Sequence, residues 1–132
     1  MPETSYTVVN LKAVEDRAPS FGLGPNLESR FATRALELEK LGLSYFRIAP
    51  GFRLPIGHRH GEQEEVYVVV SGSVRMKVDD EVVELSAWDA IRVPGPVARC
   101  PEAGPNGAEL IVAGAPRLER SDAELLRDWW TD

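Results

Sequence analysis

Two histidines, His58 and His60, are the only ones in the chain, and a single residue separates them. Successive side chains of a β-strand point to opposite faces, so on a strand both imidazoles face the same side. Gly61 and the polar residues after it are typical of a hairpin loop. A valine-rich run at residues 66–70 then predicts the returning strand. The sequence therefore predicts a β-hairpin that aims two imidazoles at one point.

A pair of glutamates, Glu64 and Glu65, begins the returning strand. Strand parity lets only one of them share a face with the imidazoles. If Glu65 points inward, Tyr67 shares its face and Glu64 lies on the opposite one. Two histidines with one carboxylate form the ligand set of non-haem iron and of several other divalent metals. The hairpin is thus a candidate metal site.

The same residues resemble the first motif of the cupin superfamily. That motif has a glycine, five residues, H-x-H, three or four residues, a glutamate, six residues and a glycine. Here His58 and His60 are followed by four residues, Glu65, six residues and Gly72, whereas six residues instead of five separate Gly51 from His58. The resemblance implies that His58, His60 and Glu65 are three of the family's four metal ligands.

The second motif of the family supplies the fourth ligand, a histidine that follows a P-x-G turn. In this chain Pro94 matches the proline, Pro96 replaces the glycine and Arg99 falls at the histidine position. Arginine does not deprotonate and cannot ligate a metal. Two interpretations stay open: a three-ligand metal with open coordination positions, or a metal-free site in which Arg99 binds a carboxylate or phosphate of a ligand. A shift of one residue in register would instead turn Cys100 inward.

Short β-prone segments separated by turn signals lie on both sides of the hairpin. They predict roughly eight to ten strands in an antiparallel sandwich or barrel. The resemblance implies an all-β fold, the antiparallel double-stranded β-helix or jelly-roll barrel, with a core at about residues 43–115. Residues 71–73 are expected to form a turn. The predicted strands, besides those of the hairpin, are Leu43–Ala49, Val74–Val78, Val82–Leu85, Ala90–Val93, Val97–Cys100 and Glu109–Ala113.

Beyond this core, the 132 residues are expected to form one domain. N-terminal strands are predicted within residues 6–36, at residues 6–11 and 30–36. Residues 34–41 also have helical spacing, so a short helix or a wide turn there is the alternative. At the other end, Ser121 and Glu124 have the spacing of a capping box. This pattern predicts a short C-terminal α-helix from about Asp122 to Trp130.

The composition excludes several classes of function. A net charge of −6 without a basic cluster argues against binding to nucleic acid. Uninterrupted apolar runs fall short of the roughly 20 residues that span a bilayer, so we expect no membrane association. One cysteine cannot form a disulfide within the chain. Together these features favour a cytoplasmic protein.

The resemblance implies one divalent transition metal, either Fe, Mn, Ni, Zn or Cu, which the ligand set does not distinguish. We expect the cavity to bind or act on a small anionic organic molecule, with dioxygenase- or isomerase-like chemistry in the case of an enzyme. Tyr67 and Tyr45 are candidate proton donors, and Arg99, Arg47 and Trp88 are candidate ligand contacts. The aromatic residues could equally fill the barrel as core.

Whether the protein is an enzyme, a metal-free binding or sensing module, or chiefly a dimerisation unit stays open at this level. Arg99 separates the first two hypotheses. An Arg99 that points into the cavity within reach of His58 favours the metal-free binder, and an Arg99 turned to solvent favours the three-ligand metal. The resemblance and the apolar strand faces also imply a homodimer, because most soluble oligomers are two-fold dimers.

Overall fold

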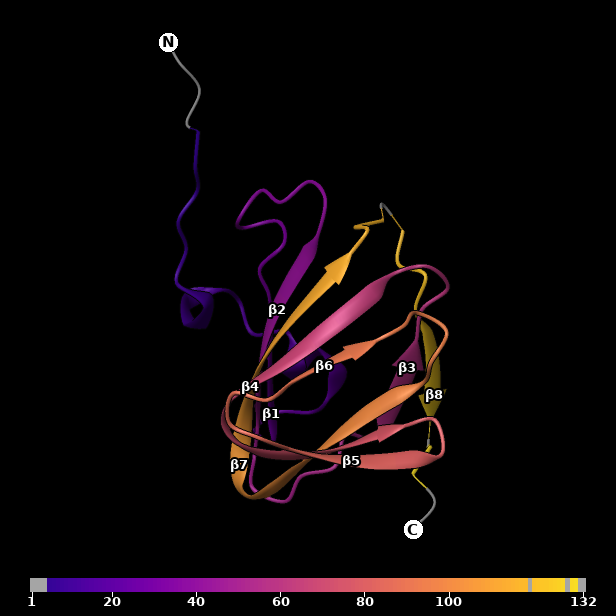
Figure 1. Cartoon of the computed structure of the whole chain (residues 1–132). Helices are drawn as coiled ribbons and strands as arrows, with labels where there is room; N and C mark the ends of the chain where they lie inside the picture. The colour runs from indigo at the N-terminus through magenta and orange to yellow at the C-terminus, as the bar shows by residue number, and fades with distance from the viewer. Residues whose placement is uncertain (1–4, 119, 128, 131–132) are drawn as a thin grey trace.

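A computed structural model describes residues 5–118, 120–127 and 129–130. Within these residues the chain forms eight strands in one strongly curled sheet, with two short 3-10 helices near the N-terminus (Figure 1). The elements are η1 Leu11–Ala13, η2 Ala18–Phe21, β1 Leu27–Phe31, β2 Gly42–Ile48, β3 Ile56–Arg59, β4 Glu64–Val78, β5 Glu81–Ser86, β6 Ala90–Val93, β7 Arg99–Ala115 and β8 Glu124–Arg127.

Two long antiparallel strands, β4 and β7, connect the two halves of the barrel. They pair along their whole length, from Glu64 opposite Ala115 to Val78 opposite Arg99. The neighbouring strands follow the order β1-β2-β7-β3-β8, while β5 and β6 pair with β4. This arrangement confirms the all-β jelly-roll prediction. It corrects the strand list, because each long strand was expected as two short ones.

Residues 71–73 form no turn but a bulged part of β4, and the bulge changes which side chains face inward. Before it Tyr67 and Val69 are buried, and after it Val74 and Met76 are buried. Gly72 has φ of 73°, and a Cβ there would lie 1.9 Å from the carbonyl oxygen of Gly107. Only glycine fits such a site. The motif glycine therefore lets β4 bend from one half of the barrel into the other.

The N-terminal region differs from the prediction. Residues 5–10 form no strand, and in Figure 1 this segment extends away from the barrel. Strand β1 ends at Phe31, so the strand expected at residues 30–36 is largely a turn, closed by a hydrogen bond from the Leu36 N–H to the Ala32 carbonyl. Residues 6–10 pair with no described strand of the sheet, so β-propensity alone did not make this segment a strand.

The predicted C-terminal helix is wrong: residues 124–127 form strand β8, antiparallel to β3. Both guanidinium nitrogens Nε and Nη2 of Arg59 donate to the Glu124 carboxylate, at 3.0 and 2.9 Å. The Ser121 hydroxyl accepts from the N–H of Ala123 in a local turn, not from a helical N3 residue. A nine-residue helix is marginal in water, and pairing with the free edge of β3 outweighs it. Residue 128 of that helix lies outside the described residues.

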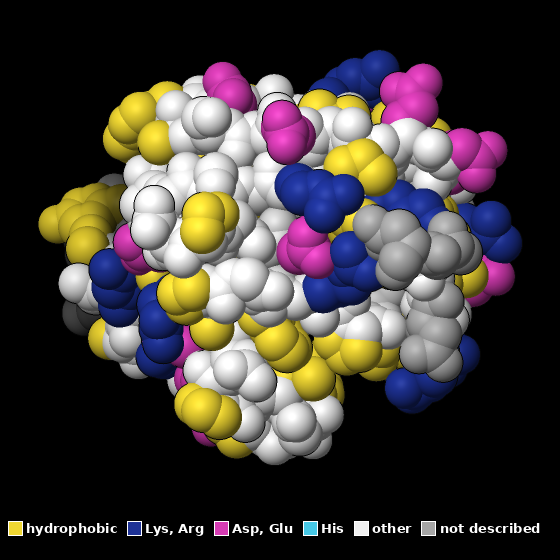
Figure 2. Space-filling model, turned by 90° about the horizontal axis from the view of Figure 1, so that it is seen from below, with side chains coloured by type: hydrophobic (Ala, Val, Ile, Leu, Met, Phe, Trp, Pro, Cys, Tyr) yellow, Lys and Arg dark blue, Asp and Glu magenta, His cyan; other side chains and the backbone are white. Residues whose placement is uncertain are grey.

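Charges on the surface alternate in sign. Figure 2 views the molecule from below and shows Lys and Arg side chains next to Asp and Glu side chains. Arg53 and Arg75 both contact the Glu102 carboxylate, at 2.7 and 2.9 Å. Among the described residues, no helix has the length and apolar character needed to cross a bilayer.

Candidate metal site

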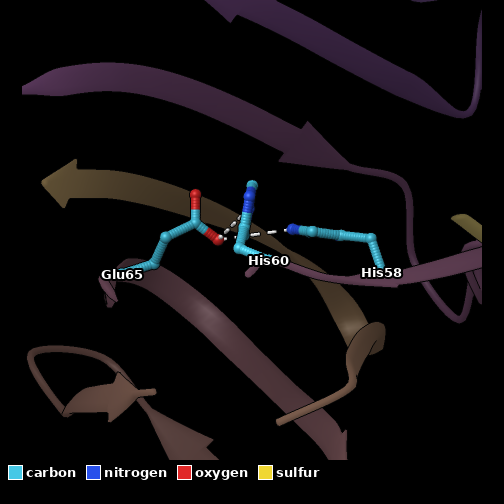
Figure 3. A group of neighbouring side chains, drawn as sticks. All are labelled: His58, His60 and Glu65. Atoms are coloured by element: carbon cyan, nitrogen blue, oxygen red, sulfur yellow. Dashed lines mark hydrogen bonds and ion pairs between the residues drawn. The ribbon is translucent and has the colours of Figure 1, made fainter. Parts of the chain in front are cut away.

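His58, His60 and Glu65 converge at the β3–β4 hairpin. His58 lies on β3, His60 directly follows that strand, and Glu65 lies on β4. Figure 3 shows both imidazoles pointing at the same carboxylate oxygen. The Nε2 atoms of His58 and His60 are 3.3 and 3.4 Å from Glu65 Oε1. One potential ligand atom from each residue lies within 4.8 Å of the others, which brings together the three predicted ligands.

Contacts at its backbone N–H and at one ring nitrogen hold His60 in place. Its N–H donates to the Gly95 carbonyl at 2.7 Å, and its Nδ1 lies 2.7 Å from Asp122 Oδ1. The residue is 8% exposed, and its Nε2 is buried without a hydrogen-bond partner among the described residues. A buried polar atom without a partner is costly unless a ligand or water satisfies it. This atom points at the other two potential ligands.

The site holds its ionisable groups away from their ordinary pKa values. Burial alone would raise the pKa of Glu65, but the hydrogen bond with His58 and the close approach of His60 outweigh it and keep that pKa well below 4.5. The nearby Glu65 carboxylate, 3.4 Å from Nε2, and Asp122 raise the pKa of His60 against the opposing effect of burial. The backbone N–H groups of Glu62 and Gln63, with His60, overcome burial and lower the pKa of Asp122 to about 2.

Tyr67 is the candidate proton donor that does lie at this site. Its hydroxyl donates to Glu65 Oε1 at 3.0 Å, and the residue lines the adjoining cavity. Burial raises the pKa of Tyr67 well above 10, which keeps the hydroxyl protonated at neutral pH. Tyr67 therefore adds a neutral donor beside the charged carboxylate.

Arg99 points inward but does not reach the cavity. It pairs with His58 across β3 and β7 and is 0% exposed. Its Nη2 donates to the carbonyls of Val93 and Pro94, and its Nη1 lies 3.7 Å from Glu65 Oε1. The expected contact of Arg99 with an anionic ligand is thus corrected, because the anion nearest to it belongs to Glu65.

Cys100 lies on the other side of β7. Its thiol donates to the Leu54 carbonyl at 3.2 Å, and burial raises its pKa to about 11. A buried, protonated thiol is a poor ligand and a poor nucleophile. The register therefore keeps Arg99, and not Cys100, on the inner face.

A cavity of about 970 Å³ adjoins the potential ligands. Polar or charged side chains and apolar side chains line it in similar numbers, and the exposed area of the wall is mainly apolar, as in small-molecule sites. Arg17, Arg34 and Arg117 also line it, together with Glu15. Apolar wall residues include Phe21, Leu27, Phe46, Ile48, Leu54, Ile56, Leu110 and Val112.

Three sequence-predicted site residues lie away from this cavity. The Tyr45 hydroxyl donates to Glu109 on the outer side of β2, and Arg47 on the same face pairs with Glu28. Trp88 is 76% exposed in the turn between β5 and β6, where its φ is 74°. None of the three therefore contacts the cavity as predicted, and the buried Tyr45 is packed in the wall of the barrel. The parity of β2 places Phe46 and Ile48 inward instead.

Asp122 is the site residue that sequence reasoning missed. Its carboxylate contacts His60 and two backbone N–H groups of the hairpin loop. In the sequence it was assigned to the first turn of a helix, where an acidic residue complements the helix dipole. The contact with His60 spans 62 positions, so no local pattern could indicate it.

Comparisons with known proteins agree with this geometry. A family model described as "Cupin domain" matches residues 44–107. A cupin protein from Bacteroides fragilis superposes with a TM-score of 0.71 at 18% identity, covering 89% of this chain and 90% of that chain. A cupin described as RmlC-like, from Shewanella frigidimarina, has a TM-score of 0.65 at 21% identity, covering 90% and 97%.

Oxalate decarboxylase from Bacillus subtilis gives a TM-score of 0.77 at 21% identity, covering 98% of this chain but 34% of that chain. At these identities the likeness shows the fold alone. No curated protein matches the sequence. The matched cupin domain contains His58, His60 and Glu65 at the spacing of the first motif, and the barrel around them is a jelly roll. Residues 44–107 therefore match a cupin domain, within a barrel that has the fold of the cupin structures.

Proposed function

We propose that this cupin holds one divalent transition metal on His58, His60 and Glu65, next to a cavity that binds a small anionic organic molecule. The observation that carries the proposal is the buried Nε2 of His60, which lacks a partner among the described residues and faces Glu65 beside the cavity. Two imidazoles and a carboxylate suit Fe, Mn, Ni, Zn or Cu. Three protein ligands would leave coordination positions open for a substrate.

The residues of the chain have separate roles in this proposal. A divalent metal here would supply Lewis-acid polarisation of a substrate oxygen, as dioxygenase- or isomerase-like chemistry requires. Tyr67 keeps its proton and orients Glu65 through the 3.0 Å hydrogen bond. Arg99 compensates part of the buried negative charge of Glu65. The apolar walls exclude water from the bound molecule.

An anionic group on the ligand is supported by the arginines of the cavity lining. Arg34 is exposed at the cavity, and the Nη1 of Arg117 donates to the Leu38 carbonyl nearby. These cations, and not Arg99, are placed to meet a carboxylate or phosphate. We expect aliphatic carboxylates to bind more tightly than primary amides of the same chain length. Arg34→Gln should weaken carboxylate binding about 2- to 5-fold, as for exposed ion pairs.

The decisive experiment measures metal content by inductively coupled plasma mass spectrometry in the purified, tag-free protein. A His58→Ala/His60→Ala double variant removes two potential ligands, and Arg92→Gln is the matched control on the outer surface, where Arg92 pairs with Glu64. We expect about one equivalent of a transition metal in the wild type and in Arg92→Gln, and none in the double variant. Absence of metal in the wild type, even after reconstitution, would overturn the metal proposal.

A metal-free binding or sensing cupin is the second candidate. It is favoured by the inward Arg99, whose charge lies 3.7 Å from Glu65 and lowers the affinity for a second cation. In that case His58 and His60 would hydrogen-bond the ligand directly. The same metal measurement separates the two candidates, and carboxylate binding without metal would support this one.

A homodimer and a cytoplasmic location stay predictions. Exposed apolar side chains at Phe31, Val82 and Trp88 offer surface for a second copy. Sedimentation of the purified protein tests the dimer directly, and a monomer at micromolar concentration would contradict it.

A further inference from the structure

We propose that Asp122, in the C-terminal segment, is a positioning residue that sets the tautomer of His60 and thereby the affinity of the metal site. The inference rests on the metal site proposed above. It adds a residue outside the matched cupin domain of residues 44–107. The C-terminal segment would then be part of the site and not only a cover for the barrel edge.

Both oxygens of the Asp122 carboxylate are engaged by the hairpin that carries the histidines. Oδ1 lies 2.7 Å from His60 Nδ1, and Oδ2 accepts from the N–H groups of Glu62 and Gln63 at 2.6 and 3.2 Å. A Cβ on Gly61 would lie 3.5 Å from Oδ2, so the carboxylate approaches the loop closely. One side chain therefore fixes the ring of His60 and the loop that follows it.

The tautomer follows from the chemistry of the pair. An ionised carboxylate only accepts hydrogen bonds, so the proton in the short Asp122 contact belongs to His60 Nδ1. In the neutral imidazole the lone pair is then on Nε2, the atom that faces Glu65 and lacks a partner among the described residues. Carboxylates that accept from the second nitrogen of a ligating histidine act in this way on metal sites.

The segment that carries Asp122 is tied to the barrel at several points beyond it. Strand β8 pairs with β3 from Ile56 to Arg59, and Glu124 binds the Arg59 guanidinium. Further on, Trp129 packs over Gly57, where a Cβ would lie 2.9 Å from its ring. The Trp129 carbonyl also accepts from Lys77 Nζ at 2.7 Å. These contacts hold Asp122 against His60 without a helix.

The test compares zinc affinities, measured by competition with a chromophoric chelator, in the wild type, Asp122→Ala, Asp122→Asn and Glu124→Gln. Glu124→Gln is the matched control, because it weakens the attachment of β8 without touching His60. We expect Asp122→Ala to weaken zinc binding about 10- to 100-fold. Asp122→Asn keeps an acceptor oxygen and should lose less. Glu124→Gln should stay within about twofold of the wild type.

A long-range ¹H–¹⁵N spectrum of the zinc-loaded proteins reports the tautomer of His60 directly. A merely structural role of Asp122 would leave this tautomer unchanged. The chain has two histidines, so the spectrum contains two sets of imidazole signals. The spectrum of a variant that lacks one histidine assigns each set. We expect a protonated Nδ1 and a metal-bound Nε2 for His60 in the wild type, with loss or broadening of the Nδ1 proton in Asp122→Ala. If Asp122→Ala does not fold, the proton shift and affinity in Asp122→Asn decide.

The outcomes separate this inference from the proposed function. A wild type that binds no zinc overturns both. Zinc binding by the wild type with equal affinity in Asp122→Ala overturns the positioning role alone. Equal losses in Asp122→Ala and Glu124→Gln would assign the effect to the attachment of β8, and a His60 with the proton on Nε2 would contradict the tautomer.

Discussion

Two clusters in this barrel have the same chemistry and opposite surroundings. In each, a tyrosine hydroxyl donates to a glutamate, the pKa of the glutamate is lowered and the pKa of the tyrosine is raised. The inner cluster consists of Glu65, Tyr67, His58 and His60, and the outer cluster consists of Glu109, Tyr45, Ser71 and Lys12.

The difference lies in what each cluster leaves unsatisfied. Glu109 accepts from Tyr45 and Ser71 and pairs with Lys12 at the surface, so its two oxygens are occupied. The inner cluster keeps the buried His60 Nε2 without a partner among the described residues, next to a cavity of about 970 Å³. A shifted pKa therefore does not by itself mark a site. An unsatisfied donor atom beside a cavity is the stronger signal.

The largest expected difference between the two clusters is the loss of folding stability when the glutamate of each cluster is replaced by glutamine. Glu65→Gln leaves the buried Arg99 charge without compensation and should lower the free energy of unfolding by about 3 kcal/mol or more. Glu109→Gln acts at a partly exposed pair and should cost about 1 kcal/mol or less. Urea unfolding of the metal-free proteins measures both. Equal losses would show that burial of Arg99 does not distinguish the clusters.

Next in size is stabilisation by metal. Zinc at about 100 times its dissociation constant should raise the free energy of unfolding by about 2.7 kcal/mol. The gain should persist in Glu109→Gln and vanish in His58→Ala, because only the inner cluster offers two imidazoles. Thermal unfolding with and without zinc measures this. A gain retained in His58→Ala would place zinc elsewhere.

Removing a tyrosine hydroxyl should have a smaller effect on metal affinity, and only at the inner cluster. Tyr67→Phe frees Glu65 to rotate and should weaken zinc binding up to about tenfold, at the low end for groups that orient a ligand. Tyr45→Phe should leave the affinity unchanged while costing about 1 kcal/mol of stability. Chelator competition and urea unfolding on the two variants measure both quantities. An affinity loss in Tyr45→Phe would contradict the separation of the clusters.

The smallest expected effect is on acid stability. Hydrogen bonds from Tyr45, Ser71 and Lys12 lower the pKa of Glu109 from 4.5 to about 2. A lowered folded-state pKa contributes stability that is complete above pH 4.5 and is lost as the pH falls toward 2. Glu109→Gln should therefore show a shallower loss of stability with falling pH in this window. Urea midpoints across that range measure the slopes, and parallel curves would argue against the shift.

Local patterns predicted the parts of the molecule in which neighbours along the chain are also neighbours in space. Strand parity placed His58 and His60 on one face, the motif spacing selected Glu65 as their partner, and the motif glycine Gly72 lies where a positive φ is required. Prediction failed where pairing between segments distant in the sequence decides the local structure. The residues from Asp122 onward have a capping-box pattern, yet an available edge on β3 made them a strand.

The period of two along the strands by itself indicated an all-β sandwich or barrel, and the resemblance to the cupin motif implied the jelly-roll class and the three potential metal ligands. Only the tertiary structure decided what surrounds them. It buried Arg99 against Glu65, turned Arg47 and Trp88 away from the cavity and brought Asp122 to His60. These contacts join distant positions, and their energy depends on burial and pairing that exist only once the barrel has closed.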